Sequence, residues 1–213
     1  MKIIVTSDTF GVLPVLDREC DLFIHCGNFC PPTKINESLE TQMSWLDKEF
    51  TPWIKNIQAK HKIIMPGNLD LAVEYLDPNF EFYIDAIFLK GHAVTIDKMI
   101  VYGTPWTPYT PRVDEELRLY VARNDAIFDA MIERIPLQTN ILISRIAPLG
   151  ILDKRGSENA GNQKILDKVQ SLPNLKMNLF GFASDEGGLY SIKNNILYAN
   201  ANVGQLGYIG IEA

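Results

Sequence analysis

The stretch KIIVTSDTFG, residues 2–11, decides the fold of this chain. A short β-branched run ends in a polar turn that carries an acid, Asp8. In α/β proteins, binding and catalytic side chains are usually placed at the carboxyl end of a buried strand. We therefore expect residues 2–6 to form a buried strand, with the turn after it facing a functional site.

Four later segments repeat this pattern of an apolar run followed by a polar turn. They are residues 22–28, 62–70, 141–145 and 177–184. The carboxyl ends of parallel strands lie at one edge of a sheet, so we expect these turns to meet in space.

Bulk properties indicate a globular protein with a substantial core. The chain has 213 residues, of which 46% are hydrophobic and 22% charged, and a net charge of -6. An acidic chain lacks the positive field needed for general binding to nucleic acid or membrane surfaces. No apolar run approaches the roughly 20 residues of a membrane span. With no leader-like segment after Met1, we expect one cytoplasmic domain over 1–213.

The order of expected elements is alternating β and α at first, and mostly β later. Apolar spacing predicts a helix over 36–60 that Pro52 kinks or splits, and a second helix over 113–134. Between them we expect a β meander over 82–102 and a proline-rich loop over 103–111. This order favours a core of two mixed sheets with helices outside.

Shorter elements complete the prediction. We expect small helices within 12–20 and 71–76 and a longer one over 162–171. The segment 148–161 is expected to be a loop, and Asn194-Asn195 a hairpin turn. Further strands are expected at 22–26, 62–66, 140–146, 175–181, 188–193, 195–200 and 206–211.

The five turns, in their order, resemble the motifs of the calcineurin-like metallophosphoesterases. The matching blocks are Ser7-Asp8-Thr9-Phe10-Gly11, His25-Cys26-Gly27-Asn28, Gly67-Asn68-Leu69-Asp70, the block that starts at Ser144-Arg145, and Phe180-Gly181-Phe182-Ala183-Ser184. The resemblance covers essentially the whole chain. It implies a four-layer αββα sandwich of two mixed β-sheets flanked by helices.

Other segments resemble one branch of that family, the small metallophosphodiesterases that act on cyclic nucleotides. The segments that carry this narrower resemblance are residues 102–108 (YGTPWTP), 148–153 (PLGILD) and Asn200-Ala201.

The chain departs from the family at most positions that hold its two metal ions. Only Asp8 and Asn68 keep the family's residue types. Phe10 replaces the first-turn histidine, and Asn28 replaces the bridging aspartate. The other departures are Leu69 for the histidine near the phosphate, Arg145 for the lone histidine, and Phe182 and Ser184 for the paired histidines.

These departures predict a protein without catalysis or a metal cofactor. Asn28 is neutral and bridges metal ions poorly, Phe10 and Phe182 have no lone pair, and Arg145 is a permanent cation. Without a metal there is no activated hydroxide and no Lewis acid.

Our first hypothesis is a pseudoenzyme that binds a phosphate-containing ligand, such as a nucleotide or cyclic oligonucleotide, without cleaving it. Arg145 would hold the phosphate, and aromatic rings would stack on a base. Alternatively, Arg145 pairs with Asp8 or Asp70. The candidate ligand-binding residues are Asp8, Phe10, Asn28, Asn68, Asp70, Arg145, Phe182 and Ser184.

Two other hypotheses stay open. The fold serves as a protein-interaction scaffold through Trp106 and Tyr109. Or the oxygen atoms of the acids and amides hold a single Mg²⁺ or Mn²⁺ ion that supports weak phosphodiesterase activity. Lys154 and Arg155 are expected to be solvated, although they lie in the loop after the Arg145 block and could reach an anionic ligand.

Overall fold

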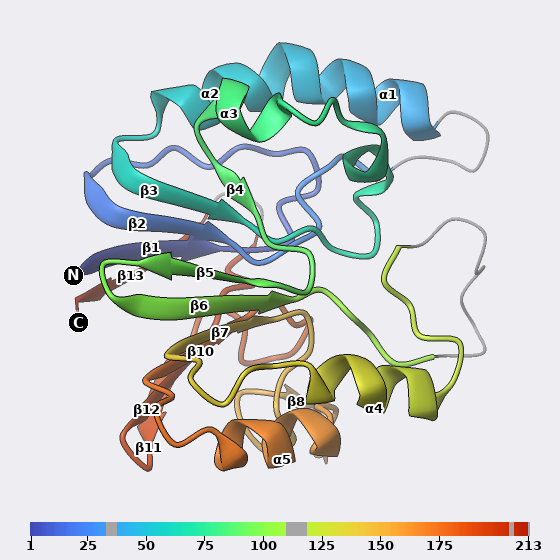
Figure 1. The fold of residues 1–213 in the computed structure, drawn as a ribbon, viewed down its shortest axis with the longest axis vertical. Coiled ribbons are helices and arrows are strands. Elements are labelled where there is room, and N and C mark those ends of the chain that lie inside the picture. Colours follow the sequence, from blue (N-terminus) through green and yellow to red (C-terminus); the bar gives the residue numbers. More distant parts are fainter. Residues whose placement is uncertain (33–37, 110–118, 205–206, 213) are drawn as a thin grey trace.

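The computed structural model describes residues 1–32, 38–109, 119–204 and 207–212. Two mixed β-sheets pack face to face, and helices cover both outer faces (Figure 1). Helices α1 to α3 lie over the first sheet, and α4 and α5 lie over the second. The four-layer αββα sandwich predicted from the sequence is confirmed.

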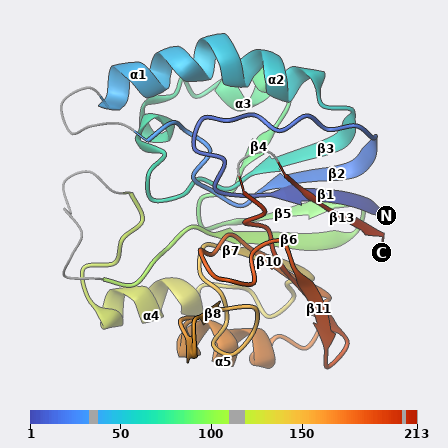
Figure 2. The ribbon, with the colours of Figure 1, turned by 180° about the vertical axis from the view of Figure 1, so that it is seen from behind.

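The first sheet has five strands in the order β13-β1-β2-β3-β4. Strands β1 to β4 run parallel, and β13 pairs antiparallel with β1 at the edge, as Figure 2 shows from behind. The bounds are β1 Lys2–Thr6, β2 Cys20–His25, β3 Ala59–Ile64, β4 Ile87–Phe88 and β13 Ile209–Glu212.

The second sheet has six strands in the order β11-β12-β10-β7-β6-β5. Its four central strands are parallel, and the two edge strands are antiparallel to their neighbours. The bounds are β5 Ala93–Ile96, β6 Met99–Thr104, β7 Ile141–Ser144, β10 Met177–Phe180, β11 Tyr190–Lys193 and β12 Ile196–Asn200. A separate hairpin joins β8 Lys154–Arg155 to β9 Glu158–Asn159.

The long helix predicted over 36–60 is three consecutive helical segments, with a π-helical turn in the middle. Pro52 lies in the first turn of the third segment, where its missing N–H is tolerated. The helical bounds are α1 Ser38–Trp45, η1 Leu46–Phe50, α2 Thr51–Asn56, η2 Leu71–Tyr75, α3 Phe80–Ile84, α4 Asp125–Glu133 and α5 Gln163–Ser171. Within the described ranges no helix is long and apolar enough to cross a bilayer.

Both faces of β1 are buried, which explains its continuous apolar sequence. Ile3 and Val5 point into the layer between the two sheets, and Ile4 points to the layer under the first group of helices. In that outer layer Phe29, Phe50 and Phe88 are fully buried, and the rings of Phe29 and Phe50 stack at 4.9 Å. This packing holds the turns after β1 and β2 in place.

Two predicted elements are wrong in the first half of the chain. Residues 12–19 form an irregular segment, not a helix; the Pro14 carbonyl accepts a hydrogen bond from the Trp53 indole at 3.0 Å. The β run expected from Phe82 to Leu89 begins instead with α3, and only β4 is a strand. Asp85, with a φ of 52°, ends α3 in the left-handed conformation.

Two further predictions fail in the second half. The helix expected over 113–134 begins only at Asp125, where the Asn124 side chain accepts the Ile127 N–H at 2.9 Å; residues 113–118 lie outside the described part. Residues 120–122 bond to Thr107 instead of forming helix. The loop expected over 148–161 contains the β8–β9 hairpin. The Asn194-Asn195 turn is confirmed, with φ values of 53° and 61°.

We predict that Phe50→Ala lowers the free energy of unfolding by about 3–5 kcal/mol, because it opens a cavity beneath the first sheet. Phe50 is fully buried, whereas Phe82 is 92% exposed. Phe82→Ala is therefore the matched control and should change stability by less than about 0.5 kcal/mol. Urea denaturation measures both, and equal losses would contradict the assigned packing.

Candidate functional site

The turn after β1 is held in a left-handed conformation that aims Asp8 at the second sheet. Asp8 has a φ of 54°, which Asp and Asn tolerate better than most residues. Its N–H donates to the Gly27 carbonyl at 2.9 Å, and the Ser7 hydroxyl donates to its Oδ2 at 2.7 Å. The carboxylate is 3% exposed. A charge at this depth requires a partner.

Arg145, directly after β7, supplies that partner from the other sheet. Nη2 lies 2.5 Å from Asp8 Oδ1, and Nη1 lies 3.2 Å from Oδ2, which is a bidentate ion pair. Nη1 also donates to the Gly181 carbonyl, after β10. The Arg145 residue is 9% exposed, and its Nε–H has no acceptor within the described part of the chain. The sequence-based alternative of an Arg145–Asp8 pair is confirmed.

Asn28, after β2, connects this pair to the turn after β3. Its Nδ2 donates to Asp8 Oδ1 at 3.1 Å, and its Oδ1 accepts the Leu69 N–H at 3.1 Å. The residue has a φ of 56° and is 3% exposed. The Asn28 side-chain amide therefore links the turn after β1 to the turn after β3.

Asp70 fixes the same turns from behind. It is fully buried and accepts backbone N–H groups from Asn28 (2.8 Å), Gly67 (2.6 Å) and Cys30 (2.8 Å). Burial raises the pKa of its carboxyl to about 6, although these N–H groups and Arg145 oppose the shift. These three hydrogen bonds come from backbone N–H groups, and its carboxyl also interacts with the Cys30 thiol, so Asp70 has a structural role in the site.

Two glycines permit the close approach of these turns. A Cβ at Gly181 would lie 1.8 Å from Ser7 Oγ, and one at Gly67 would lie 2.2 Å from Asn28 Oδ1. Because no side chain fits either space, glycine is required there.

His25, the last residue of β2, is fully buried beside this network. Its Nδ1 accepts the Gly27 N–H at 3.2 Å, so in the neutral ring the proton is on Nε2, 3.1 Å from Thr9 Oγ1. Burial, with a smaller effect from Arg145, lowers the pKa of His25 from 6.5 to about 3. The ring is therefore neutral and unavailable to solvent at pH 7.

A cleft of about 430 Å³ opens in front of the Asp8–Arg145 pair. Residues from segments far apart in the sequence line it. Those with polar or aromatic groups include Asn68, Thr107, Arg145, Arg155, Asn162 and Phe182. None of its lining residues among those described is acidic or a histidine, and two are arginines, so the lining favours an anion.

The structure divides the predicted site residues into three groups. Asn68, Arg145 and Phe182 line the cleft, and Asp8, Asn28 and Asp70 form the buried network behind it. Phe10 and Ser184 do not line this cleft. The Ser184 hydroxyl donates to the Leu152 carbonyl at 3.1 Å and accepts from Asn200, while Phe10, half-buried with a φ of 49°, donates its N–H to the Asn28 carbonyl.

Arg155, expected from the sequence to be solvated but able to reach an anionic ligand, is both exposed and part of the cleft lining. It lies at the tip of the β8–β9 hairpin, its guanidinium is 4.8 Å from the centre of the Phe182 ring, and its Nε donates to the Ala183 carbonyl at 2.6 Å. The two residues Gly156-Ser157 between paired strands are a hairpin signal, and Gly156 has a φ of 59°. That signal locates the hairpin but not its contact with the cleft.

No protein-family model matches the chain. A UPF0046 protein of Caenorhabditis elegans is 23% identical over 217 residues, which is 94% of this chain and 69% of the relative. Metallophosphoesterase domain-containing protein 1 of Homo sapiens is 25% identical over 234 residues, 97% of this chain and 67% of the relative.

Among solved structures, one crystal structure superposes with a TM-score of 0.66 and 13% identity, covering 94% of this chain and 90% of the other. The phosphopantetheinyl hydrolase of Mycobacterium tuberculosis superposes with a TM-score of 0.53 and 11% identity, covering 95% and 89%. The chain therefore has the calcineurin-like metallophosphoesterase fold. Its sequence is related to the metallophosphoesterase domain-containing proteins.

The donor set of this site does not fit the pair of metal ions that the fold family implies. Both Asp8 oxygens already accept N–H groups from Arg145, and the Asn28 oxygen accepts the Leu69 N–H. The described residues contain no group of three or more His, Cys, Asp or Glu side chains able to hold a metal ion. A divalent ion at Asp8 would have to displace a paired, permanently charged guanidinium.

We predict that Arg145→Met lowers the free energy of unfolding by about 3–5 kcal/mol, because it leaves the Asp8 carboxylate buried without a counter-ion. Adding Asp8→Asn should recover most of this loss, since Asn keeps the left-handed turn and carries no charge. Urea denaturation of both single variants and the double variant gives the coupling energy. A double variant no more stable than Arg145→Met would contradict the pair.

We predict that His25 makes the protein less stable as the pH falls. Its folded pKa of about 3 is below the unfolded value of 6.5, so the stabilisation is complete above pH 6.5 and is lost as pH falls toward 3. Between pH 7 and 5, the stability advantage of wild type over His25→Asn should shrink by about 2 kcal/mol. His61 is partly exposed, so His61→Gln is the control and should keep the wild-type pH dependence. A constant difference between wild type and His25→Asn would contradict a neutral His25.

Proposed function

We propose that this chain binds a small phosphate-containing ligand in the cleft without cleaving it. The observation that carries the proposal is that Arg145 lines the cleft and that its buried Nε–H has no acceptor within the described ranges. An unsatisfied buried donor is unfavourable by about 1–3 kcal/mol. A phosphate oxygen would satisfy it with a charge-assisted hydrogen bond.

Two other groups support an anionic ligand. The Asn68 side chain makes no hydrogen bond among the described residues, which leaves its amide free for a ligand, and Arg155 adds a second positive charge at the cleft. The cleft volume of about 430 Å³ falls within the range typical of small-molecule sites. A nucleotide is the ligand class we propose.

The same geometry favours binding over hydrolysis. His25 is buried and neutral, and Asp70 is occupied by three backbone donors, so neither can act as a general base at the cleft. Asp8 is paired with Arg145. A bound phosphate ester would therefore meet positive charge without a group that activates water.

The contacts of the proline-rich segment favour the ligand-binding proposal over the scaffold hypothesis. Thr107 and Pro108 line the cleft, and Trp106 packs edge-on against Tyr120 at 5.9 Å between ring centres. The hydroxyl of Tyr120 donates to Glu74 at 2.5 Å. Thr107 and Pro108 thus form part of the cleft wall, Trp106 is partly buried against Tyr120, and Tyr109 is 39% exposed.

We predict that calorimetry with adenine nucleotides detects binding below millimolar concentration, and that chromatography recovers the ligand intact. Asn68→Ala should weaken binding about three- to tenfold by removing one hydrogen bond. Asn56→Ala, at the exposed end of α2, is the matched control and should leave affinity unchanged.

Two results would contradict this proposal. Absence of binding to every phosphate compound would remove the ligand site. Turnover of bis-p-nitrophenyl phosphate with added Mn²⁺, abolished by Asp8→Ala, would make the protein a weak phosphodiesterase instead.

A further inference from the structure

The two guanidinium groups at the cleft differ in how their charge is balanced. Arg145 is neutralised by its bidentate pair with Asp8. Arg155 contacts only uncharged partners, the Ala183 carbonyl and the Phe182 ring, and no carboxylate of the described residues lies within 4.0 Å of it. The uncompensated positive charge of the cleft is therefore on Arg155, at the exposed rim.

The two arginines donate hydrogen bonds to backbone carbonyls on either side of Phe182. Arg145 donates to the carbonyl of Gly181, and Arg155 donates to the carbonyl of Ala183. Both arginines line the same cleft, so one ligand in that cleft can lie against both side chains. Arg155 has five N–H donors, of which one is used within the described structure.

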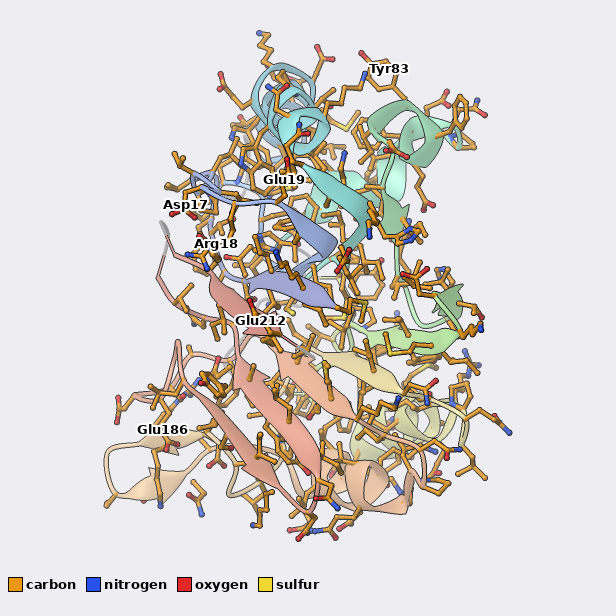
Figure 3. The ribbon with its side chains drawn as sticks, turned by 90° about the vertical axis from the view of Figure 1, so that its left-hand side faces the viewer. Asp17, Arg18, Glu19, Tyr83, Glu186 and Glu212 are labelled. Carbon is orange, nitrogen blue, oxygen red and sulfur yellow. The ribbon has the colours of Figure 1, made fainter. Side chains whose placement is uncertain are left out.

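The hairpin that carries Arg155 is anchored to the segment Asp185-Glu186. The Lys154 N–H donates to Glu186 at 2.9 Å, the Gly156 N–H donates to Asp185 at 2.6 Å, and the Asp185 N–H donates to the Lys154 carbonyl at 2.7 Å. Figure 3 shows Glu186 beside this hairpin. Arg155 is therefore positioned before a ligand arrives, which reduces the entropy lost on binding.

We propose that Arg155 is a second anion contact and that the cleft takes a ligand with two adjacent anionic groups, an organic diphosphate. This inference rests on the proposed phosphate-binding function and narrows it. Arg145 holds one phosphoryl group through its unpaired Nε–H, and Arg155 holds the next through its free Nη donors while its other face stays on the Phe182 ring. A mononucleotide 3′,5′-cyclic phosphodiester carries one anionic group, so it offers the two guanidinium groups only one negative charge to share.

The test compares ligands that differ in anionic groups, by calorimetry on the full chain. Pyrophosphate is compared with inorganic phosphate, and ADP with 3′,5′-cyclic AMP. The first pair contains no nucleoside, so it tests the anionic groups alone. Wild type should bind the diphosphate of each pair at least about tenfold more tightly. Arg155→Gln should remove most of this preference and change the affinity for the single-phosphate ligand by less than about threefold.

Lys154→Gln is the matched control, because Lys154 neighbours Arg155 on the same strand and does not line the cleft. It should keep the wild-type preference for diphosphates. Thermal unfolding and circular dichroism of each variant establish that the hairpin change leaves the fold intact.

Two outcomes overturn the inference in different ways. If cyclic AMP binds wild type as tightly as ADP does, or if Arg155→Gln weakens the binding of both equally, then Arg155 does not select for diphosphates. The proposed phosphate-binding function still stands in that case. If no phosphate compound binds at all, the proposed function fails and this inference fails with it.

Discussion

The ion pair between Asp8 and Arg145 is the interaction on which the rest of the site depends. It joins the turn after β1 in one sheet to the turn after β7 in the other, and Arg145 continues to Gly181 after β10. A buried pair is favourable only when its geometry is good and its remaining donors and acceptors are satisfied. Ser7 and Asn28 satisfy the Asp8 oxygens, whereas the Arg145 Nε–H has no acceptor in the described part of the chain, and we propose that a ligand supplies one.

The backbone of the site follows from the tightness of its turns. Asp8 and Asn28 adopt left-handed conformations that their short polar side chains tolerate, and Gly67 and Gly181 leave room where turns touch. Hydrogen bonds from Asp70 to three backbone groups then lock the turns after β2 and β3 together. This frame does not require a bound ion, because its charges and hydrogen bonds are supplied by the chain itself.

Much of the fold follows from sequence because buried parallel strands have continuous apolar sequences, each ended by a recognisable polar turn. The sequence also predicts an acidic partner for Arg145 but leaves it open between Asp8 and Asp70, and the structure shows that the partner is Asp8. Other features depend on contacts that are distant in sequence. The aromatic segment Phe80–Ile84 has strand-like composition but is a helix ended by Asp85, and Arg155 reaches the cleft only because its hairpin docks on residues 183–186. Local patterns contain no signal for such docking, and nothing in the sequence distinguishes one phosphate ligand from another.

The pairing of β1 with β13 has a consequence for how the molecule folds. Lys2 is opposite Glu212 across this edge, so two segments from opposite ends of the described sequence form adjacent strands. Contacts of such long sequence separation raise the contact order and slow folding. During synthesis at the ribosome, β1 waits with one edge unpaired until β13 emerges, whereas the central strands of the second sheet are made in the later part of the chain. The open edge of a nascent β1 is therefore a place where strand mispairing can occur.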